Sequence, residues 1–157
     1  MRALGDELVE APLSGRKGIV VYAHAELPEV DPRGGGTENV TLTTRAMVPF
    51  ALETSSGDVL VDGTEADVVF APQRVPNRSK ERERAFVVAH GRRAEVAAVA
   101  TFRELVLVPG LRVAVHGMAI VEADDTTAER GYRDGVPTRT RLVAHPDYRI
   151  SIGRPRD

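Results

Sequence analysis

The fold class is indicated most clearly by residues 48–62, which read Val48-Pro49-Phe50-Ala51-Leu52-Glu53-Thr54-Ser55-Ser56-Gly57-Asp58-Val59-Leu60-Val61-Asp62. The runs 48–53 and 58–62 are rich in apolar residues that favour strands. Between them, 54–57 has the small polar residues and the glycine typical of a hairpin loop. This stretch therefore predicts an antiparallel β-hairpin.

The same pattern recurs on both sides of the hairpin. Short apolar or alternating runs, bounded by Gly, Pro, Asp and Asn, predict further strands at 18–23, 39–44, 65–71, 103–108, 112–121, 142–144 and 148–152. Turns about every ten residues and the absence of an internal repeat are typical of a β-rich barrel or sandwich. A parallel α/β sheet is disfavoured, because helices do not alternate with strands.

One segment has a helical pattern. Ser79 is a candidate N-cap, and dense helix formers follow it, with Phe86, Val87 and His90 on one side. The pattern predicts a helix over 79–90 that ends at Gly91. The Ala-rich stretch 94–101 fits either a helix or a strand.

The amino-acid composition limits which folds and which functions are possible. The chain has 157 residues, of which 42% are hydrophobic, and a formal net charge of −2, so we expect one folded domain over 1–157. Its fold should be mainly β, an antiparallel OB-like barrel or sandwich with one short helix. The absence of cysteine excludes disulfides, zinc ribbons, RING-type zinc sites and thiol catalysis. With neither an apolar signal segment nor a membrane-spanning run, the sequence predicts a cytoplasmic protein, peripheral to a membrane only through a partner.

Catalytic signatures are not apparent. The run 34–37, Gly-Gly-Gly-Thr, lacks the Lys of a phosphate-binding P-loop. The four histidines, His24, His90, His116 and His145, are scattered without a second ligand at metal spacing. Asp124 and Asp125 are favoured in a turn for local hydrogen bonds. We therefore expect a protein that is not an enzyme, with no catalytic residues, no metal and no cofactor.

Basic residues are the best candidates for binding. Residues 74–93 contain seven cationic residues against two glutamates, and 130–157 contain seven Arg against three Asp. If the two segments are neighbours in space, they form a cationic face for phosphate or anionic lipid. The other interpretation is ordinary solvated charge, because aromatic stacking residues are nearly missing. The candidate partner-binding residues are Arg74, Arg78, Arg82, Arg84, Arg92, Arg93, Arg130 and Arg133.

Three motifs occur in order along the chain. The first is Pro12-Leu13-Ser14-Gly15-Arg16 running into 19–22, the second is Phe50-x-Leu52-x-x-x-x-Gly57-x-Val59-x-Val61-Asp62, and the third is Phe102-Arg103-Glu104-x-x-Leu107-x-Pro109-Gly110-x-x-Val113-x-Val115-x-Gly117. The series resembles the GIDE domain, also called the BAM (beside-a-membrane) domain, of Mulan-type E3 ubiquitin ligases and their prokaryotic relatives. The resemblance extends over about 11–121, and 148–151 fits the last strand of that family. We expect a structural role for its motif residues Ser14, Gly15, Arg16, Gly57, Glu104, Pro109, Gly110 and Gly117.

The resemblance implies a β-rich module that recognises proteins rather than performing chemistry. Without cysteine the chain has no RING, and Lys17-Gly18 replaces the Pro-Cys usual after the Ser-Gly-Arg of the family. We therefore expect a non-enzymatic adaptor or sensor that binds a protein partner. The loops 31–37 and 124–138 are candidate recognition loops. The alternative is an OB-like nucleic-acid-binding protein that uses the Arg-rich segments 74–93 and 130–156.

Overall fold

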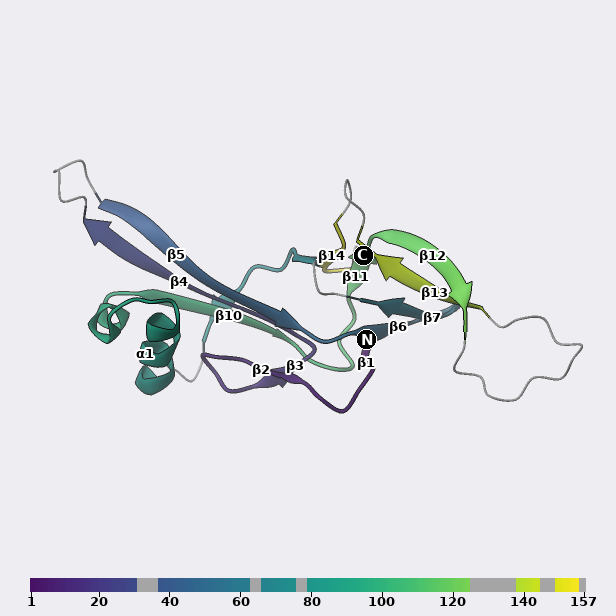
Figure 1. The fold of residues 1–157 in the computed structure, drawn as a ribbon, viewed down its shortest axis with the longest axis horizontal. Coiled ribbons are helices and arrows are strands. Elements are labelled where there is room, and N and C mark those ends of the chain that lie inside the picture. The colour runs from purple at the N-terminus through teal and green to yellow at the C-terminus, as the bar shows by residue number, and fades with distance from the viewer. Residues whose placement is uncertain (31–36, 63–65, 76–78, 125–137, 145–148, 156–157) are drawn as a thin grey trace, which may run out of the picture. The chain divides into compact units, whose positions relative to one another are not determined.

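The computed structural model describes residues 1–30, 37–62, 66–75, 79–124, 138–144 and 149–155 (Figure 1). The chain forms two compact units, each made from separate parts of the sequence. Unit 1 comprises Met1–Glu7, Val48–Phe70 and Pro109–Asp157, and unit 2 comprises Leu8–Met47 and Ala71–Val108. Strands dominate the described residues, which contain one α-helix, so the predicted mainly β fold with a short helix is confirmed.

Unit 2 is built on a four-stranded antiparallel sheet with the strand order β5-β4-β10-β9. Its strands are β4 (Val20–Val30), β5 (Thr37–Met47), β9 (Gln73–Arg74) and β10 (Thr101–Leu107). A small ladder of β2 (Val9–Glu10) and β3 (Lys17–Gly18) belongs to the same unit.

Strands β4 and β5 extend beyond the predicted runs 18–23 and 39–44. They stay in register from Val20 opposite Met47 to Val30 opposite Thr37. Pro28 lies inside β4, where a sequence pattern would end a strand. The third strand, β10, ends opposite Glu26, so β4 has a neighbour on only one side at Pro28, where a residue without an N–H is tolerated.

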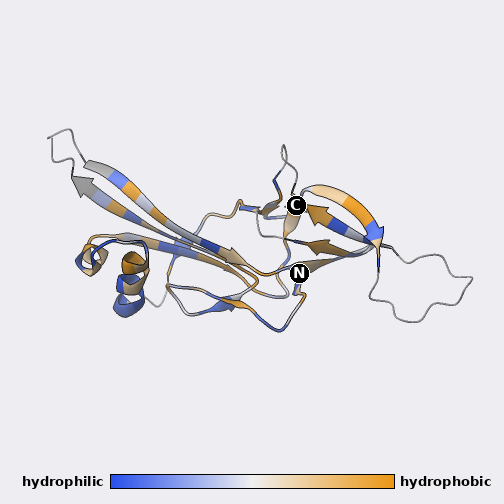
Figure 2. Cartoon of the chain, in the orientation of Figure 1, coloured by the Kyte–Doolittle hydropathy of each residue, from blue (hydrophilic) through white to orange (hydrophobic). Residues whose placement is uncertain are grey.

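The helix α1 (Lys80–Ala89) confirms the prediction for 79–90. The Ser79 hydroxyl oxygen accepts a hydrogen bond from the Arg82 backbone N–H, and Gly91 follows the helix with φ +73°. Phe86 and Val87 are buried, and Figure 2 shows α1 hydrophilic over its first half and apolar over its second half. The ambiguous segment 94–101 begins as a 3₁₀ helix, η1 (Ala94–Ala98), and continues into β10.

The core of unit 2 lies between the sheet, α1 and η1. Its buried residues from the strands, the helices and the first motif are Leu13, Ala23, Ala25, Leu27, Leu42, Val75, Phe86, Val87, Ala97, Ala100 and Phe102. The rings of Phe86 and Phe102 meet edge-on, with centroids 6.3 Å apart. Alanine at 23 and 25 leaves room for these rings above the central strand, which explains why so few aromatic residues suffice.

Unit 1 contains a five-stranded sheet of order β1-β6-β7-β13-β12 and a three-stranded sheet of order β11-β14-β8. The strands of the first are β1 (Arg2–Ala3), β6 (Phe50–Thr54), β7 (Gly57–Val61), β12 (Met118–Ala123) and β13 (Thr138–Val143). Those of the second are β8 (Asp67–Val68), β11 (Ala114–His116) and β14 (Ser151–Gly153).

The predicted hairpin at 48–62 is confirmed as β6 and β7, joined at Thr54 opposite Gly57. Gly57 has φ +113°, a conformation that favours glycine, and the Thr54 hydroxyl donates to its carbonyl oxygen. Two pairings, β7 with β13 and β8 with β14, are parallel. Among the described residues no sheet closes into a barrel, so of the two predicted arrangements the sandwich is the one consistent with these sheets.

Several predictions fall on residues that the structure does not describe. The recognition loops 31–37 and 124–138 lie almost wholly outside the described residues, as do Arg78, Arg130 and Arg133. Of the predicted strand 148–152, the part from Arg149 onward is described. His116, expected at the surface, is exposed at the end of β11.

Candidate functional site

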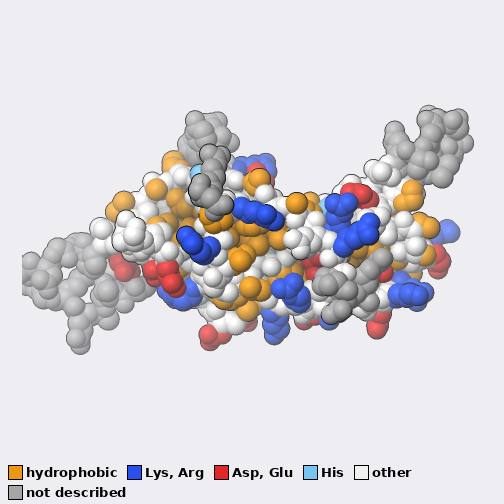
Figure 3. Space-filling model, turned by 180° about the vertical axis from the view of Figure 1, so that it is seen from behind, with side chains coloured by type: hydrophobic (Ala, Val, Ile, Leu, Met, Phe, Trp, Pro, Cys, Tyr) orange, Lys and Arg blue, Asp and Glu red, His pale blue; other side chains and the backbone are white. Residues whose placement is uncertain are grey.

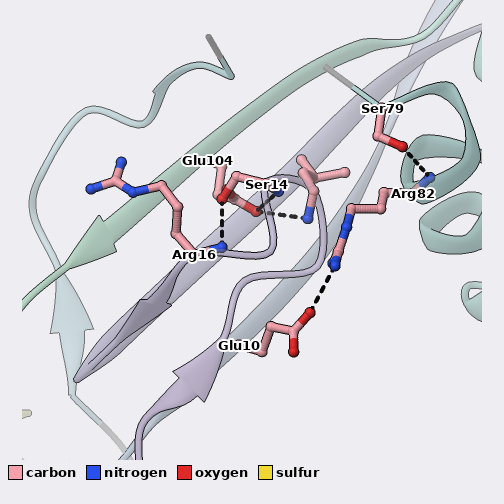
Figure 4. A network of polar contacts seen from close by, with 7 residues as sticks. Glu10, Ser14, Arg16, Ser79, Arg82 and Glu104 are labelled. Atoms are coloured by element: carbon pink, nitrogen blue, oxygen red, sulfur yellow. Dashed lines mark hydrogen bonds and ion pairs between the residues drawn. The ribbon is translucent and has the colours of Figure 1, made fainter. Parts of the chain in front are cut away.

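Glu104 joins the first and third motifs within unit 2 (Figure 4). It lies on β10 and is buried, with 8% of its surface exposed. Its Oε1 accepts hydrogen bonds from the backbone N–H of Leu13 at 2.8 Å and of Ser14 at 3.4 Å. The carboxylate thus satisfies backbone donors of a tight turn that would otherwise be buried without an acceptor, which is a structural role.

The same turn receives Arg82 from α1. Gly15 has φ +72°, and a Cβ at this position would come within 2.7 Å of Arg82 Nη2. The guanidinium passes over the bare backbone of Gly15 and donates to Glu10 Oε1 at 2.9 Å (Figure 4). The Ser14 hydroxyl oxygen accepts from the Arg16 N–H, which closes the turn. Arg82, a candidate for partner binding, is therefore engaged within unit 2.

The remaining motif residues also lie at turns and close contacts. Gly110 N–H donates to the Met1 carbonyl oxygen directly after Pro109. Gly117 lies between β11 and β12, with Ile150 and Leu142 so close that a larger residue would meet both. Gly18 has Val106 and the Leu107 carbonyl against it. These turns and close contacts are enough to explain the residues at these motif positions, and no bound ligand is needed for that explanation.

The described basic residues of segment 74–93 lie on different elements of unit 2. Arg84 lines a groove of about 640 Å³ beside α1 together with Lys80, Glu83 and Glu95, so its walls carry both signs of charge. Arg92 lies beside the apolar Leu27 and Val96, and Arg93 is the N-cap residue of η1. Figure 3 shows Lys and Arg side chains as small groups among apolar and acidic ones.

The second Arg-rich segment belongs to unit 1, and three of its four described arginines are paired with carboxylates. Arg139 Nε lies 2.7 Å from Glu122 Oε1, and Arg141 Nη2 lies 2.6 Å from Asp62 Oδ2. Arg149 lies 3.7 Å from Asp67. Because segment 74–93 belongs to unit 2, the two segments are parts of different units.

The face of the unit 2 sheet that points away from α1 carries a different arrangement. Arg74 of β9 lies opposite Arg103 of β10. Arg103 also lies opposite His24 of β4, and His24 lies opposite Thr43 of β5. Since directly opposed residues of antiparallel strands project to the same face, these four side chains form one row across the sheet. We name it the arginine row.

The arginine row contains polar atoms that the protein leaves without partners. Arg103 Nε and His24 Nε2 are buried and have no hydrogen-bond partner in the described part of the chain. Glu26 Oε1 lies 3.7 Å from His24 Nε2, beyond hydrogen-bond distance. Neither Arg74 nor Arg103 forms an ion pair with the described residues, in contrast to Arg139 in unit 1.

Beside the row, the same face carries Tyr22 opposite Leu105, both half-buried. The Tyr22 ring meets the His24 ring edge-on, with centroids 5.9 Å apart. The face is therefore a mixture of half-buried aromatic, apolar and guanidinium groups. Of the predicted candidates only Arg74 belongs to it. His24, Tyr22 and Arg103 were missed as site residues, although polar residues at 22, 24 and 26 alternate with the apolar 21, 23 and 25.

The described residues contain no cluster of three or more His, Cys, Asp or Glu that could hold a metal ion. Within the same residues, no helix is both long and apolar enough to cross a membrane. Comparison with known protein families, curated proteins and solved structures finds no match for this chain.

Proposed function

We propose that this chain is a non-enzymatic protein-interaction module of the GIDE/BAM type that acts in the cytoplasm. The observation that carries this proposal is the helix-free face of the unit 2 sheet, on which Tyr22, Leu105 and Arg103 are half-buried. Tyrosine and arginine are enriched in protein interfaces and in the residues that dominate binding energy. The helix-free face therefore has the composition expected of a surface that a protein partner covers.

The scaffold of this face suits such a role. The sheet is fixed from the other side by α1 and η1, whose buried residues form the core of unit 2. A binding surface that is held rigidly costs less ordering when a partner binds. The side chains needed for recognition are therefore presented without a conformational change in the sheet.

Nucleic-acid binding is the second candidate. It is favoured by one observation, the presence of Arg74, Arg103 and Tyr22 on the same helix-free sheet face. Against it, Arg139 and Arg141 are engaged by carboxylates. Sequence-independent binding of single strands usually combines a continuous basic groove with several stacking aromatics. The protein interaction is the function that these contacts support better.

Site-specific photo-crosslinking tests the proposed function. A photoreactive amino acid replaces Thr41, which is exposed on the helix-free face, and in a control it replaces Ala85, which is exposed on α1. In nuclease-treated extracts, we expect a discrete protein adduct from position 41 and none of that size from position 85. Equal labelling from both positions, or adducts to nucleic acid alone in untreated extracts, would contradict the proposal.

A further inference from the structure

We propose that Arg74 and Arg103, with His24 beside them, form an oxyanion site that holds a carboxylate or phosphate group of an acidic peptide segment. The site itself is inferred from the arginine row. Its assignment to a peptide rests on the proposed function.

The register brings the two guanidinium groups within reach of one anion. Arg74 and Arg103 are directly opposed across β9 and β10, so their Cα atoms are about 4.5–5.5 Å apart. Both project to the helix-free face, and Arg74 is exposed while Arg103 is half-buried. Guanidinium groups bind carboxylate and phosphate through paired N–H donors, and two of them can converge on a single oxyanion.

Among the residues that the structure describes, no carboxylate compensates this pair of arginines. Like charges directly opposite each other in a sheet are destabilising. A buried donor without an acceptor, such as Arg103 Nε, costs additional free energy. In unit 1, by contrast, Arg139 and Arg141 on β13 each have a carboxylate within 2.7 Å. An external oxyanion would remove both costs at Arg103.

The surroundings favour a peptide over a polyanion. Unit 2 contains twelve Lys and Arg against nine Asp and Glu, a small excess of positive charge. Glu26, beside His24, adds a carboxylate at the border of the row and would repel a continuous chain of phosphates. Thr43 and Tyr22 are neutral groups that can donate to or pack against a peptide. A segment with one or two acidic side chains fits this short row of charge.

Arginine side-chain NMR tests the site with simple probes. In the full ¹⁵N-labelled chain, the Arg103 Nε–Hε signal is followed during titration with inorganic phosphate and, separately, with hexaglutamate. We expect a saturable shift of this signal, while the Arg139 signal, already bonded to Glu122, stays in place. The relative affinity for the two probes distinguishes a phosphate from a carboxylate ligand. No movement of the Arg103 signal with either probe would overturn the site.

The affinity of variants for hexaglutamate tests whether the site binds an acidic peptide. Arg103→Gln should weaken hexaglutamate binding about tenfold, the loss of roughly one charge-assisted hydrogen bond. Arg84→Gln on the outer side of α1 is the matched control and should bind as the wild type does. Equal affinities of wild type and Arg103→Gln would overturn the proposal.

Further outcomes separate this inference from the proposed function. If position 41 cross-links a protein but the Arg103 signal never moves, the oxyanion site is wrong and the interaction module stands. If phosphate moves the Arg103 signal but no protein adduct forms, the site stands and the protein-interaction function is wrong. If a ten-residue oligothymidylate binds more tightly than hexaglutamate, and Arg103→Gln weakens that binding, the assignment to a peptide is overturned in favour of nucleic acid.

Discussion

The two faces of the unit 2 sheet are made by alternate residues of the same strands, and they differ in burial and in polarity. Ala23, Ala25 and Phe102 face α1 and are buried in the core. Tyr22, His24 and Arg103, their immediate neighbours, face the other way, and among the described residues His24 Nε2 and Arg103 Nε are buried without a hydrogen-bond partner. One face stabilises the fold, and we propose that the other binds a partner. Substitutions on the two faces should therefore separate stability from binding.

Phe86→Ala should have the largest effect, because it removes the ring that α1 packs onto the core. Phe86 is 3% exposed and contacts the rings of Phe102 and His90. We expect a loss of about 3–5 kcal/mol in the free energy of unfolding, measured by urea denaturation. Val88→Ala, on the exposed side of the same helix, should change it by less than about 0.5 kcal/mol. Similar losses for both variants would show that α1 is not packed as described.

Glu104→Ala should have the second-largest effect on stability, because it leaves the backbone N–H of Leu13 without a hydrogen-bond acceptor. The expected loss in the free energy of unfolding is about 1–3 kcal/mol by chemical denaturation. Glu104→Gln keeps a carbonyl oxygen for the same donor, so it should lose less. If the glutamine variant loses as much as the alanine variant, the hydrogen bonds to the turn are not what Glu104 contributes.

Ser79→Ala removes the N-cap of α1 and should have a smaller effect on the stability of the helix-covered face. The expected loss is about 1 kcal/mol, seen as a lower midpoint in thermal unfolding followed by circular dichroism. Ser79→Asp retains a capping oxygen and should restore most of that stability. An unchanged midpoint in the alanine variant would contradict the cap.

Arg74→Gln should have the smallest effect and the opposite sign. It removes a like-charge pair across β9 and β10, so the free energy of unfolding should rise by about 0.2–1 kcal/mol. Arg139→Gln in unit 1, which breaks the ion pair with Glu122, is the control and should not stabilise the protein. A destabilised Arg74→Gln variant would show that this arginine belongs to the fold rather than to a binding site.

Local features of the fold could be predicted from the sequence. The helix at 79–90 and the hairpin at 48–62 depend on capping, turn residues and nearby apolar runs, which are all visible in the sequence. The parallel pairs β7–β13 and β8–β14 join segments about eighty residues apart, and no local pattern carries that information. The same holds for the division into two units.

The candidate site was predicted less well, for the same reason. Arg74 was included because it belongs to a basic segment, whose described members lie on different elements of unit 2. Arg82 forms an ion pair with Glu10 inside unit 2, and Arg93 stands at the N-cap position of η1 without a capping side-chain hydrogen bond. Arg103 was noticed as part of a motif rather than as a site residue, because its position beside Arg74 and His24 follows from strand register alone.

The most direct test of the binding role of the helix-free face is the affinity of Arg74→Gln for hexaglutamate, measured by calorimetry beside the wild type. The variant should bind about tenfold more weakly, although its stability is equal or greater. An affinity equal to that of the wild type would contradict the claim that this face is kept open for an acidic partner.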